Sequence, residues 1–393
     1  RSAPAAREAG LKDGAFTNDS LLHQRKRPHQ QKKNARVKGG RSETVFFVML
    51  TGVLLGIASG ALWGLIYIAP LVVPDYNPIL VALSRFIAFG LISLPFLYVY
   101  RRELKRFTRT DVWQSFKLPL FGNVLFYCLL TVCIRLAGAP LAGMFMAVIP
   151  VLVAIGSNFR NAGSDAALPW AKILPPLCII FVGLVIANYS EFERAVTASA
   201  QGGTEYWVGV GFGIAAVISW TWFSIMNAEW LLKHTRLSTG AWTALQGVTV
   251  LPLVMVLFGI AAWPMGFMDT TVSVWGPAPW TFFATAFVIG LFCSWIAMIC
   301  WNSMSKRLPA GLGGQFIVFE SVFAVIYALI WRGELPTLSM GVGFAILMFG
   351  VLGSLQVFQS TIKVVHDAED EPHEARRGAA NRDRIAADGT NGI

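Results

Sequence analysis

The chain has 393 residues, of which 55% are apolar and 14% are charged, and its mean hydropathy is +0.57. Soluble domains carry about 25% charged residues, so this composition excludes an ordinary soluble globular protein and indicates an integral membrane protein. The formal net charge is +10, and most of it falls in the first 44 residues, which hold eleven Lys or Arg against four acidic residues.

The first 44 residues are polar, poor in aromatic side chains and rich in Gln, Lys, Arg and Gly, a composition typical of a disordered segment. A basic cluster directly before a first membrane helix fixes orientation on the cytoplasmic side or contacts anionic lipid, so no nucleic-acid partner is expected. The hydrophilic stretch 361–393 predicts a second disordered cytoplasmic tail.

The apolar windows between breaks of Pro, Gly and charge are about twenty residues long, enough for one bilayer-crossing helix each. They predict an all-α integral membrane protein with ten transmembrane helices. The predicted spans are 45–70, 78–100, 117–136, 139–159, 170–190, 207–231, 239–262, 280–304, 309–331 and 338–360.

The charge of the loops favours an even number of helices. With the N-terminus in the cytoplasm, the inner loops carry twelve Lys or Arg and the outer loops carry three, which is a positive-inside pattern. Both termini are therefore predicted to be cytoplasmic. The inner residues are Arg101, Arg102, Lys105, Arg106, Arg109, Lys117, Arg160, Lys172, Lys233, Arg236, Lys306 and Arg307, and the outer ones are Arg135, Arg194 and Arg332.

An internal duplication is visible when the chain is shifted against itself. A shift of 157 residues lays 51–68 over 208–225 with seven identities in eighteen positions. The matched pairs are Gly52 and Gly209, Val53 and Val210, Gly56 and Gly213, Ile57 and Ile214, Ala58 and Ala215, Trp63 and Trp220, and Ile68 and Ile225.

A second overlay, at a shift of 170 residues, lays 140–155 over 310–325. The two shifts differ because the loops differ in length. The chain is thus predicted to hold two five-helix halves, 45–190 and 207–360. Because five is odd, the halves cross the bilayer in opposite senses and form an inverted repeat, an arrangement common in transporters.

Several short motifs lie in order along the two halves: Gly56, Gly60, Trp63 and Gly64 in the first span, Arg85-Phe86 in the second, Pro150 in the fourth, and Arg332-Gly333-Glu334 after the ninth. Together with the duplication, they resemble the drug/metabolite transporter superfamily. Within it, the chain is similar to the EamA-type transporters over about residues 45 to 360.

The resemblance implies ten helices in two EamA-like repeats and secondary transport of small metabolites such as amino acids, often outward. It also implies the inner (plasma) membrane of a bacterium. The chain departs from the family pattern at two points. Glu320 stands where the second half usually has Pro, and Ser164 stands opposite Glu334, where a closing Glu would be expected.

Glu320 lies near the middle of the ninth span, where an ionisable side chain is costly and marks a functional site by default. Its carboxyl could carry a proton or neutralise a substrate amine, or it could form a structural ion pair or stay protonated and hydrogen-bonded. Arg85 in the second span could pair with Glu320, hold a substrate carboxylate bidentately, or anchor its helix by snorkelling.

Other side chains are candidates for the lining of a substrate pathway. Trp63 and Tyr67 share one helix face at a spacing of four residues, and Trp220 is the repeat partner of Trp63. The alternative for these aromatics is packing or an interface belt. Among the buried amides, Asn123 and Gln315 are the candidates for substrate contact, although such groups more often join helix to helix.

The predicted spans lack several residue types that enzymes, ATP-driven pumps and metal sites need. All five His lie in tails or loops, no Asp lies in the middle of a span, and no P-loop motif is present. We therefore expect no enzyme, no ATP-driven pump acting alone, no metal site and no cofactor. The five cysteines have no metal-ligand spacing and are predicted to be small buried hydrophobic side chains.

The sequence thus predicts a secondary active transporter, an exporter of amino acids or similar small metabolites, which works by alternating access and uses a proton gradient. Two alternatives stay open: transport of nucleotide sugars or another metabolite, and a non-transporting membrane scaffold or sensor whose tails recruit partners. The expected partners are a small-molecule substrate, the lipid bilayer and protons, and a homodimer is also open.

Overall fold

The computed structural model describes residues 47–163, 167–187, 189, 197, 203–234, 236–262, 276–333 and 335–358, and these are helical apart from turns and short connections. The predicted N-terminal arm and C-terminal tail lie outside the described residues, as does Glu334. The chain divides into two units at Leu50, and the helix packing described below lies within the unit that begins at Thr51.

Nine helices in the described part of the chain are long and apolar enough to cross a membrane. A tenth apolar segment, Val148–Arg160, is shorter and forms the end of helix α7 (Ala139–Arg160). Each of the ten lies on one of the predicted spans. The nine are Phe47–Ile68, Ile79–Val99, Arg109–Ala137, Trp170–Ala187, Thr204–Lys233, Thr239–Ala262, Pro279–Ser305, Ala310–Trp331 and Leu338–Phe358.

Several spans are divided into shorter elements by changes in helix type. The α-helices are α2 (Ala69–Val72), α3 (Pro78–Val99), α4 (Arg101–Leu104), α5 (Arg109–Pro119), α6 (Phe126–Ala137), α8 (Trp170–Ala187), α10 (Thr204–Lys233), α11 (Thr239–Ala262), α12 (Pro279–Gly290), α13 (Ala297–Ser305), α14 (Ala310–Gly313) and α15 (Val318–Arg332). Tighter 3₁₀ turns occupy Leu65–Ile68 and Gly314–Ile317, and π-helical segments occupy Leu120–Leu125 and Leu291–Ile296.

The third span begins at Arg109, eight residues before the predicted start at position 117. The local reason is a capping box, in which the side chain of Thr108 accepts from the backbone N–H of Asp111 and the Asp111 carboxylate accepts from the backbone N–H of Thr108. A capping box satisfies two helix-end donors at once. It therefore starts the helix in a charged segment that hydropathy alone assigned to a loop.

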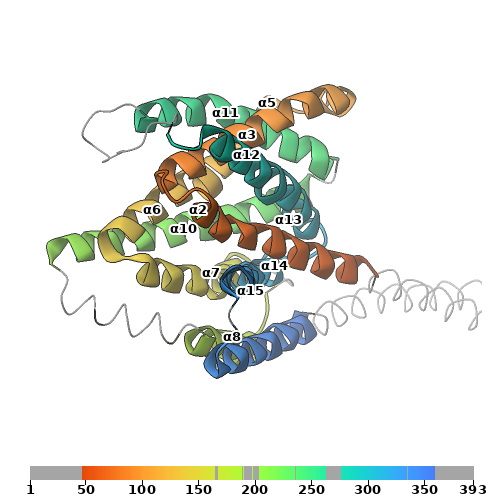
Figure 1. Ribbon diagram of the computed structural model, residues 1–393. Helices are drawn as coiled ribbons and strands as arrows, with labels where there is room; N and C mark the ends of the chain where they lie inside the picture. The colour runs from red at the N-terminus through yellow and green to blue at the C-terminus, as the bar shows by residue number, and fades with distance from the viewer. Residues whose placement is uncertain are drawn as a thin grey trace, which may run out of the picture. The chain divides into compact units, whose positions relative to one another are not determined.

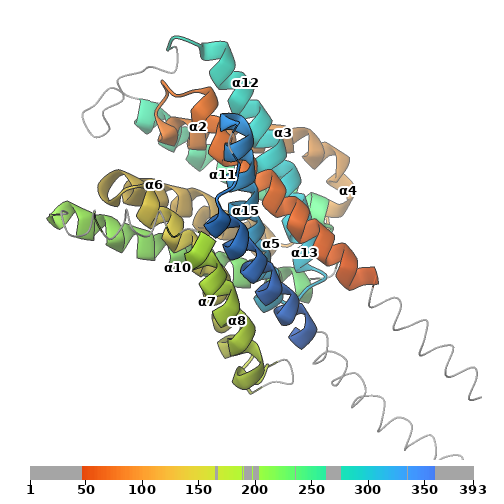
Figure 2. The same cartoon turned by 60° about the horizontal axis from the view of Figure 1, so that its bottom comes forward.

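Helices of the first predicted half pack directly against helices of the second. Helix α11 runs along α3, α10 packs on α6 and α7, and α7 in turn contacts α14 and the Gly314–Ile317 turn. Figures 1 and 2 show α10 beside α6 in both views.

The first span meets the ninth span along a row of glycines. A Cβ atom at Gly56 would lie 2.7 Å from the Phe316 ring, and one at Gly60 would lie 2.6 Å from the Phe319 Cβ and 3.0 Å from the Glu320 backbone nitrogen. Small residues at a spacing of four permit such a close helix approach. At Gly60, the close approach places the backbone of Glu320 against the first span.

Glycines also join the fifth and tenth spans. A Cβ atom at Gly183 of α8 would lie 2.5 Å from the backbone of Leu347, and one at Gly343 would lie 2.3 Å from the backbone of Ala187. A Cβ atom at Gly350 would lie 2.8 Å from the Ile180 backbone nitrogen, whereas Gly341 faces open space. The close contact of Leu338–Phe358 with α8 therefore depends on Gly343 and Gly350.

We expect Gly60→Ala to destabilise the protein by about 1–3 kcal/mol, because the added methyl group would meet backbone atoms that cannot rotate away. The measurement is the thermal midpoint of the purified protein in detergent. The matched control is Gly211→Ala in α10, where nothing lies within 4 Å of the added Cβ. Equal midpoints for the two variants would contradict the role of the glycine row.

Candidate functional site

Glu320 lies in the first turn of α15, directly after the 3₁₀ turn Gly314–Ile317, and near the middle of its span. Its side chain is buried, with 7% exposure. The hydroxyl of Tyr67 donates a hydrogen bond to the Glu320 Oε1 atom over 3.3 Å. Tyr67 comes from the 3₁₀ turn at the end of the first span, so the carboxyl is held by the span on which its own backbone packs.

Arg85 is equally buried in α3, with 4% exposure. Its NH1 atom donates a hydrogen bond to the Tyr127 hydroxyl over 3.0 Å. The guanidinium carbon lies 4.4 Å from the ring centroids of both Phe86 and Tyr127, within the range of cation–π attraction. Its Nε atom is buried and has no hydrogen-bond partner.

Among the described residues, no ion pair joins Arg85 to Glu320. The direct pair that the sequence analysis considered is therefore not formed. Each charged group instead bonds to a tyrosine hydroxyl, Arg85 to Tyr127 and Glu320 to Tyr67. The four side chains thus form two hydrogen-bonded pairs, one at each ionisable group, on neighbouring membrane spans. We call Arg85, Tyr127, Tyr67 and Glu320 the charged cluster.

Trp63 and Trp220 meet across the predicted halves, as their repeat positions suggested, and a third indole joins them. The ring centroids are 5.2 Å apart for Trp63 and Trp301, 5.4 Å for Trp220 and Trp301, and 6.4 Å for Trp63 and Trp220. Trp220 also contacts Phe126, whose ring lies against Tyr127. The tryptophans are therefore continuous with the charged cluster.

Sequence reasoning missed Trp301 and did not single out Tyr127 as an arginine partner. Trp301 is 1% exposed, and its indole nitrogen is buried without a partner. A single Trp within a long apolar window carries no motif, so its place became visible only in three dimensions. The duplication offered no signal either, because Trp301 lies outside both overlays.

The two candidate amides are not joined to the charged cluster by any described hydrogen bond. Gln315 is fully buried in the Gly314–Ile317 turn, where its Nε2 atom donates to the Gly311 carbonyl over 3.3 Å and its Oε1 atom has no partner. Asn123 is half-buried in the π-helical segment Leu120–Leu125. Their roles in substrate contact stay predictions.

Another group of amides is fully satisfied. Asn227 donates to the Asn302 Oδ1 atom over 2.9 Å, and Asn302 donates to Gln246 over 3.0 Å and to Thr243 over 2.9 Å. The Asn227 Oδ1 atom accepts from Gln246 and from the Trp242 indole. These side chains join α10, α11 and α13, so they stabilise helix packing and leave no polar atom for a ligand.

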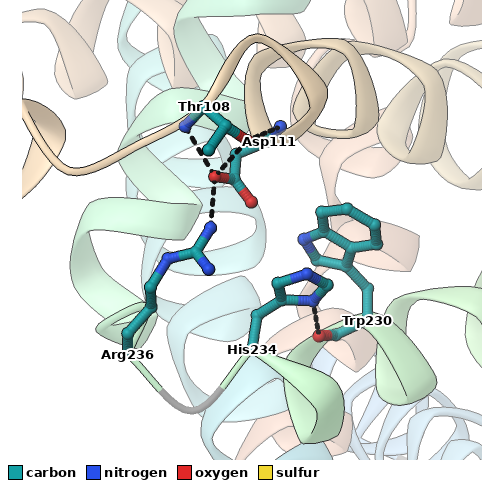
Figure 3. A network of polar contacts seen from close by, with 5 residues as sticks. All are labelled: Thr108, Asp111, Trp230, His234 and Arg236. Carbon is teal, nitrogen blue, oxygen red and sulfur yellow. Dashed lines mark hydrogen bonds and ion pairs between the residues drawn. The ribbon is translucent and has the colours of Figure 1, made fainter.

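Charged residues form a second network at one end of the helices (Figure 3). The buried Asp111 Oδ2 atom accepts from the Thr108 backbone and hydroxyl over 2.7 and 2.8 Å and pairs with Arg236 over 2.7 Å. His234 stacks on Trp230 and bonds to its carbonyl. Although the Asp111 Oδ1 atom is buried without a partner, Asp111 and Arg236 pair with each other. We therefore interpret this network as a structural clasp.

A further ion pair lies between α7 and α10. The Arg160 guanidinium binds Glu229 in a bidentate manner, over 2.5 and 3.0 Å, and Lys233 lies 3.6 Å from the same carboxylate. Within the described ranges, no group of three or more His, Cys, Asp or Glu is placed to hold a metal ion. Of the free cysteines, Cys133 and Cys293 are buried, whereas Cys178 is exposed on α8 and so departs from its predicted burial.

Comparison with known proteins gives a relative that is matched over nearly its whole length. The chain is 30% identical to the inner membrane protein YtfF of Escherichia coli (strain K12) over 305 residues, which cover 77% of this chain and 94% of that protein. Residues 50–161 match the EamA-like transporter family. The chain belongs to the EamA-like transporter family.

EamA membership makes the protein a multi-pass membrane transporter, which agrees with the resemblance found in its motifs. A solved crystal structure has a similar fold, with a TM-score of 0.57, 16% sequence identity, and coverage of 78% of this chain and 97% of that chain. At this level of identity, the likeness concerns the fold alone. The EamA fold thus places the charged cluster and the tryptophans among its membrane spans.

We expect Arg236→Gln to lower the stability of the protein by about 1–3 kcal/mol, because fully buried Asp111 would lose its cationic partner. The thermal midpoint in detergent measures the loss. Arg102→Gln, which removes an exposed arginine, is the matched control. An unchanged midpoint for Arg236→Gln would show that the clasp does not stabilise the fold.

Proposed function

We propose that the protein is a secondary active transporter that exports amino acids or similar small metabolites by alternating access of two inverted halves. Membership in the EamA-like family supports transport by a membrane protein. The observation that carries the choice of cargo is the charged cluster, because a buried guanidinium and a buried carboxyl that are not paired with each other match the two charges of an amino acid.

Two features of the helix packing support the inverted repeat. The π-helical segments Leu120–Leu125 and Leu291–Ile296 lie 171 residues apart, close to the 170-residue shift of the second sequence overlay. Each has a backbone carbonyl within it or directly after it that accepts from a serine of the other half. Ser219 bonds to the Phe121 carbonyl over 2.8 Å, and Ser59 bonds to the Ala297 carbonyl over 3.1 Å.

Reciprocal packing supports the same arrangement. The first span contacts the eighth and ninth spans through the glycine row and Ser59, whereas α10, the sixth span, contacts α6 and α7 of the third and fourth spans. Each half thus contributes its first helix to the other half. Rocking of one half against the other about the shared site is the motion that such repeats allow.

The surroundings of Glu320 support the proposed proton coupling. Its carboxyl is buried and bonded to a neutral hydroxyl rather than to a cation, and a carboxyl in such a place can gain or lose a proton when the surroundings change. Arrival of a cargo ammonium group would favour the charged form. Exchange of cargo for a proton at Glu320 would couple export to the proton gradient.

Contacts at the helix ends support the proposed orientation, with both termini in the cytoplasm of a bacterial inner membrane. The ion pairs of Asp111 with Arg236 and of Arg160 with Glu229 join segments that were all predicted on the inner side. Tyr76 stacks on Phe282 over 4.5 Å, which joins two segments predicted on the outer side. The relative YtfF is named an inner membrane protein.

In proteoliposomes, we expect a pH gradient to stimulate flux of amino acids, and Glu320→Gln to reduce this stimulation more than tenfold because the variant carboxamide cannot carry a proton. The panel should include labelled amino acids and nucleotide sugars, with and without the gradient. The matched control is Glu205→Gln, an exposed carboxyl at the start of α10.

Gradient-stimulated flux that survives in Glu320→Gln would reject Glu320 as the coupling residue. Flux of nucleotide sugars but not amino acids would reject the proposed cargo. Undiminished flux after removal of both tails would argue against a scaffold whose tails are its working parts.

A further inference from the structure

Arg85 has one occupied edge and one empty edge. The NH1 atom bonds to the Tyr127 hydroxyl, while the Nε atom is buried and unpartnered. The rings of Phe86 and Tyr127 lie at 4.4 Å from the guanidinium carbon. Among the described residues, the polar and cation–π partners of the guanidinium are therefore two aromatic rings and one hydroxyl.

No buried acid among the described residues pairs with the Nε edge of Arg85. Buried Asp111 is bonded to Thr108 and Arg236, and Glu320 is bonded to Tyr67 without reaching Arg85 as an ion pair. A buried guanidinium N–H without a partner is costly, because charged donors lose strong hydration on burial. The protein thus keeps a buried charged donor that has no hydrogen-bond partner among the described residues.

The missing partner has a defined chemistry. The Nε edge of a guanidinium presents two parallel N–H groups, which fit the two oxygens of a carboxylate in a bidentate pair. Aromatic rings on the guanidinium stabilise the cation without using up its N–H donors. A carboxylate that reaches this edge would therefore complete the hydrogen bonding of the cation, while the rings of Phe86 and Tyr127 stabilise its charge.

Resting on the amino-acid transport proposed above, we infer that Tyr127 is a positioning residue that holds the NH1 atom of Arg85 and so presents the Nε edge to the carboxylate of the cargo. The cargo class is then an amino acid whose carboxylate is free, and the corresponding amides and amines are excluded. Tyr67 positions the Glu320 carboxyl in the same way, through its hydroxyl, at the end of the site where the cargo ammonium group would bind.

Specificity for the carboxylate follows from the same arrangement. An amide presents one acceptor and an NH₂ group, so binding at the Nε edge would place donors against donors. A site whose buried polar group is left unpaired rejects such an analogue strongly. The empty edge of Arg85 thus sets the selection, and Tyr127 fixes the direction in which that edge points.

The test measures ligand binding to the purified protein in detergent, so its result does not depend on whether the protein transports the ligand. A panel of amino acids and their matching amides is titrated, and the rise in thermal midpoint gives apparent Kd values. We expect amino acids to bind at least tenfold more tightly than their amides. Tyr127→Phe should weaken amino-acid binding about tenfold and reduce the ratio of amino-acid to amide affinity. Its midpoint without ligand should also fall, because buried Arg85 loses its hydroxyl partner, so the rise on ligand addition is measured from the midpoint of each variant.

Tyr67→Phe is the matched control, because it removes a tyrosine hydroxyl of the charged cluster that bonds to Glu320 instead of Arg85. It should keep the carboxylate-over-amide ratio of the wild type. If Tyr127→Phe does not fold, Arg85→Lys replaces it, and loss of the preference for the carboxylate is expected there because an ammonium group cannot bind bidentately.

Three results would overturn the inference: no stabilisation by any amino acid, equal stabilisation by acid and amide, or an unchanged carboxylate-over-amide ratio in Tyr127→Phe and Arg85→Lys. Selective binding of the carboxylate without any flux in proteoliposomes would leave the Arg85 assignment intact and reject the proposed transport function instead.

Discussion

The close contact between the first and ninth spans determines where the ionisable groups of this protein lie. Because Gly56 and Gly60 have no Cβ atom, the ninth span lies closer to the first span than any other residue type at these positions would allow. This contact brings Glu320 beside the first span, and the 3₁₀ turn at the end of that span places the Tyr67 hydroxyl against its carboxyl. Glu320 is thereby compensated by a neutral donor rather than by a cation, and its charge stays available.

Polar groups inside this protein fall into two kinds. The Asn227 and Asn302 cluster and the Asp111 clasp have hydrogen bonds or ion pairs that join helices, and such groups stabilise packing. Arg85 is of the second kind: it is a buried cation whose NH1 atom bonds to a neutral hydroxyl and whose Nε atom has no partner. A buried charged donor without a partner is costly. Buried atoms without partners also occur in the scaffold, among them Asp111 Oδ1 and Trp230 Nε1, so the charge of Arg85 is what distinguishes it.

The amino-acid sequence predicted the helices well because each span is a long apolar window bounded by charge or proline. It also identified Glu320 as unusual, because an ionisable residue in the middle of an apolar span is recognised from residue type and position alone. The start of the third span at Arg109 was missed, because a capping box overrode low hydropathy.

The partners in the site could not be derived in the same way. Tyr67 and Glu320 are 253 positions apart, and Arg85 and Tyr127 lie on different spans. Opposite charges suggested a direct pair, but the rotation of each helix about its axis decides which side chain reaches which. Trp301 joined Trp63 and Trp220 for the same reason. Helix rotation is set by packing over the whole interface, which no local pattern contains.

The central claim is that Arg85 and Glu320 are kept unpaired so that the two charges of one amino acid can bind them. An experimental structure of the protein with a bound amino acid tests this most directly. The account predicts the cargo carboxylate at the Nε edge of Arg85 and the ammonium group within hydrogen-bond distance of Glu320. Cargo bound away from both residues, or a direct ion pair between Arg85 and Glu320 beside the bound cargo, would contradict it.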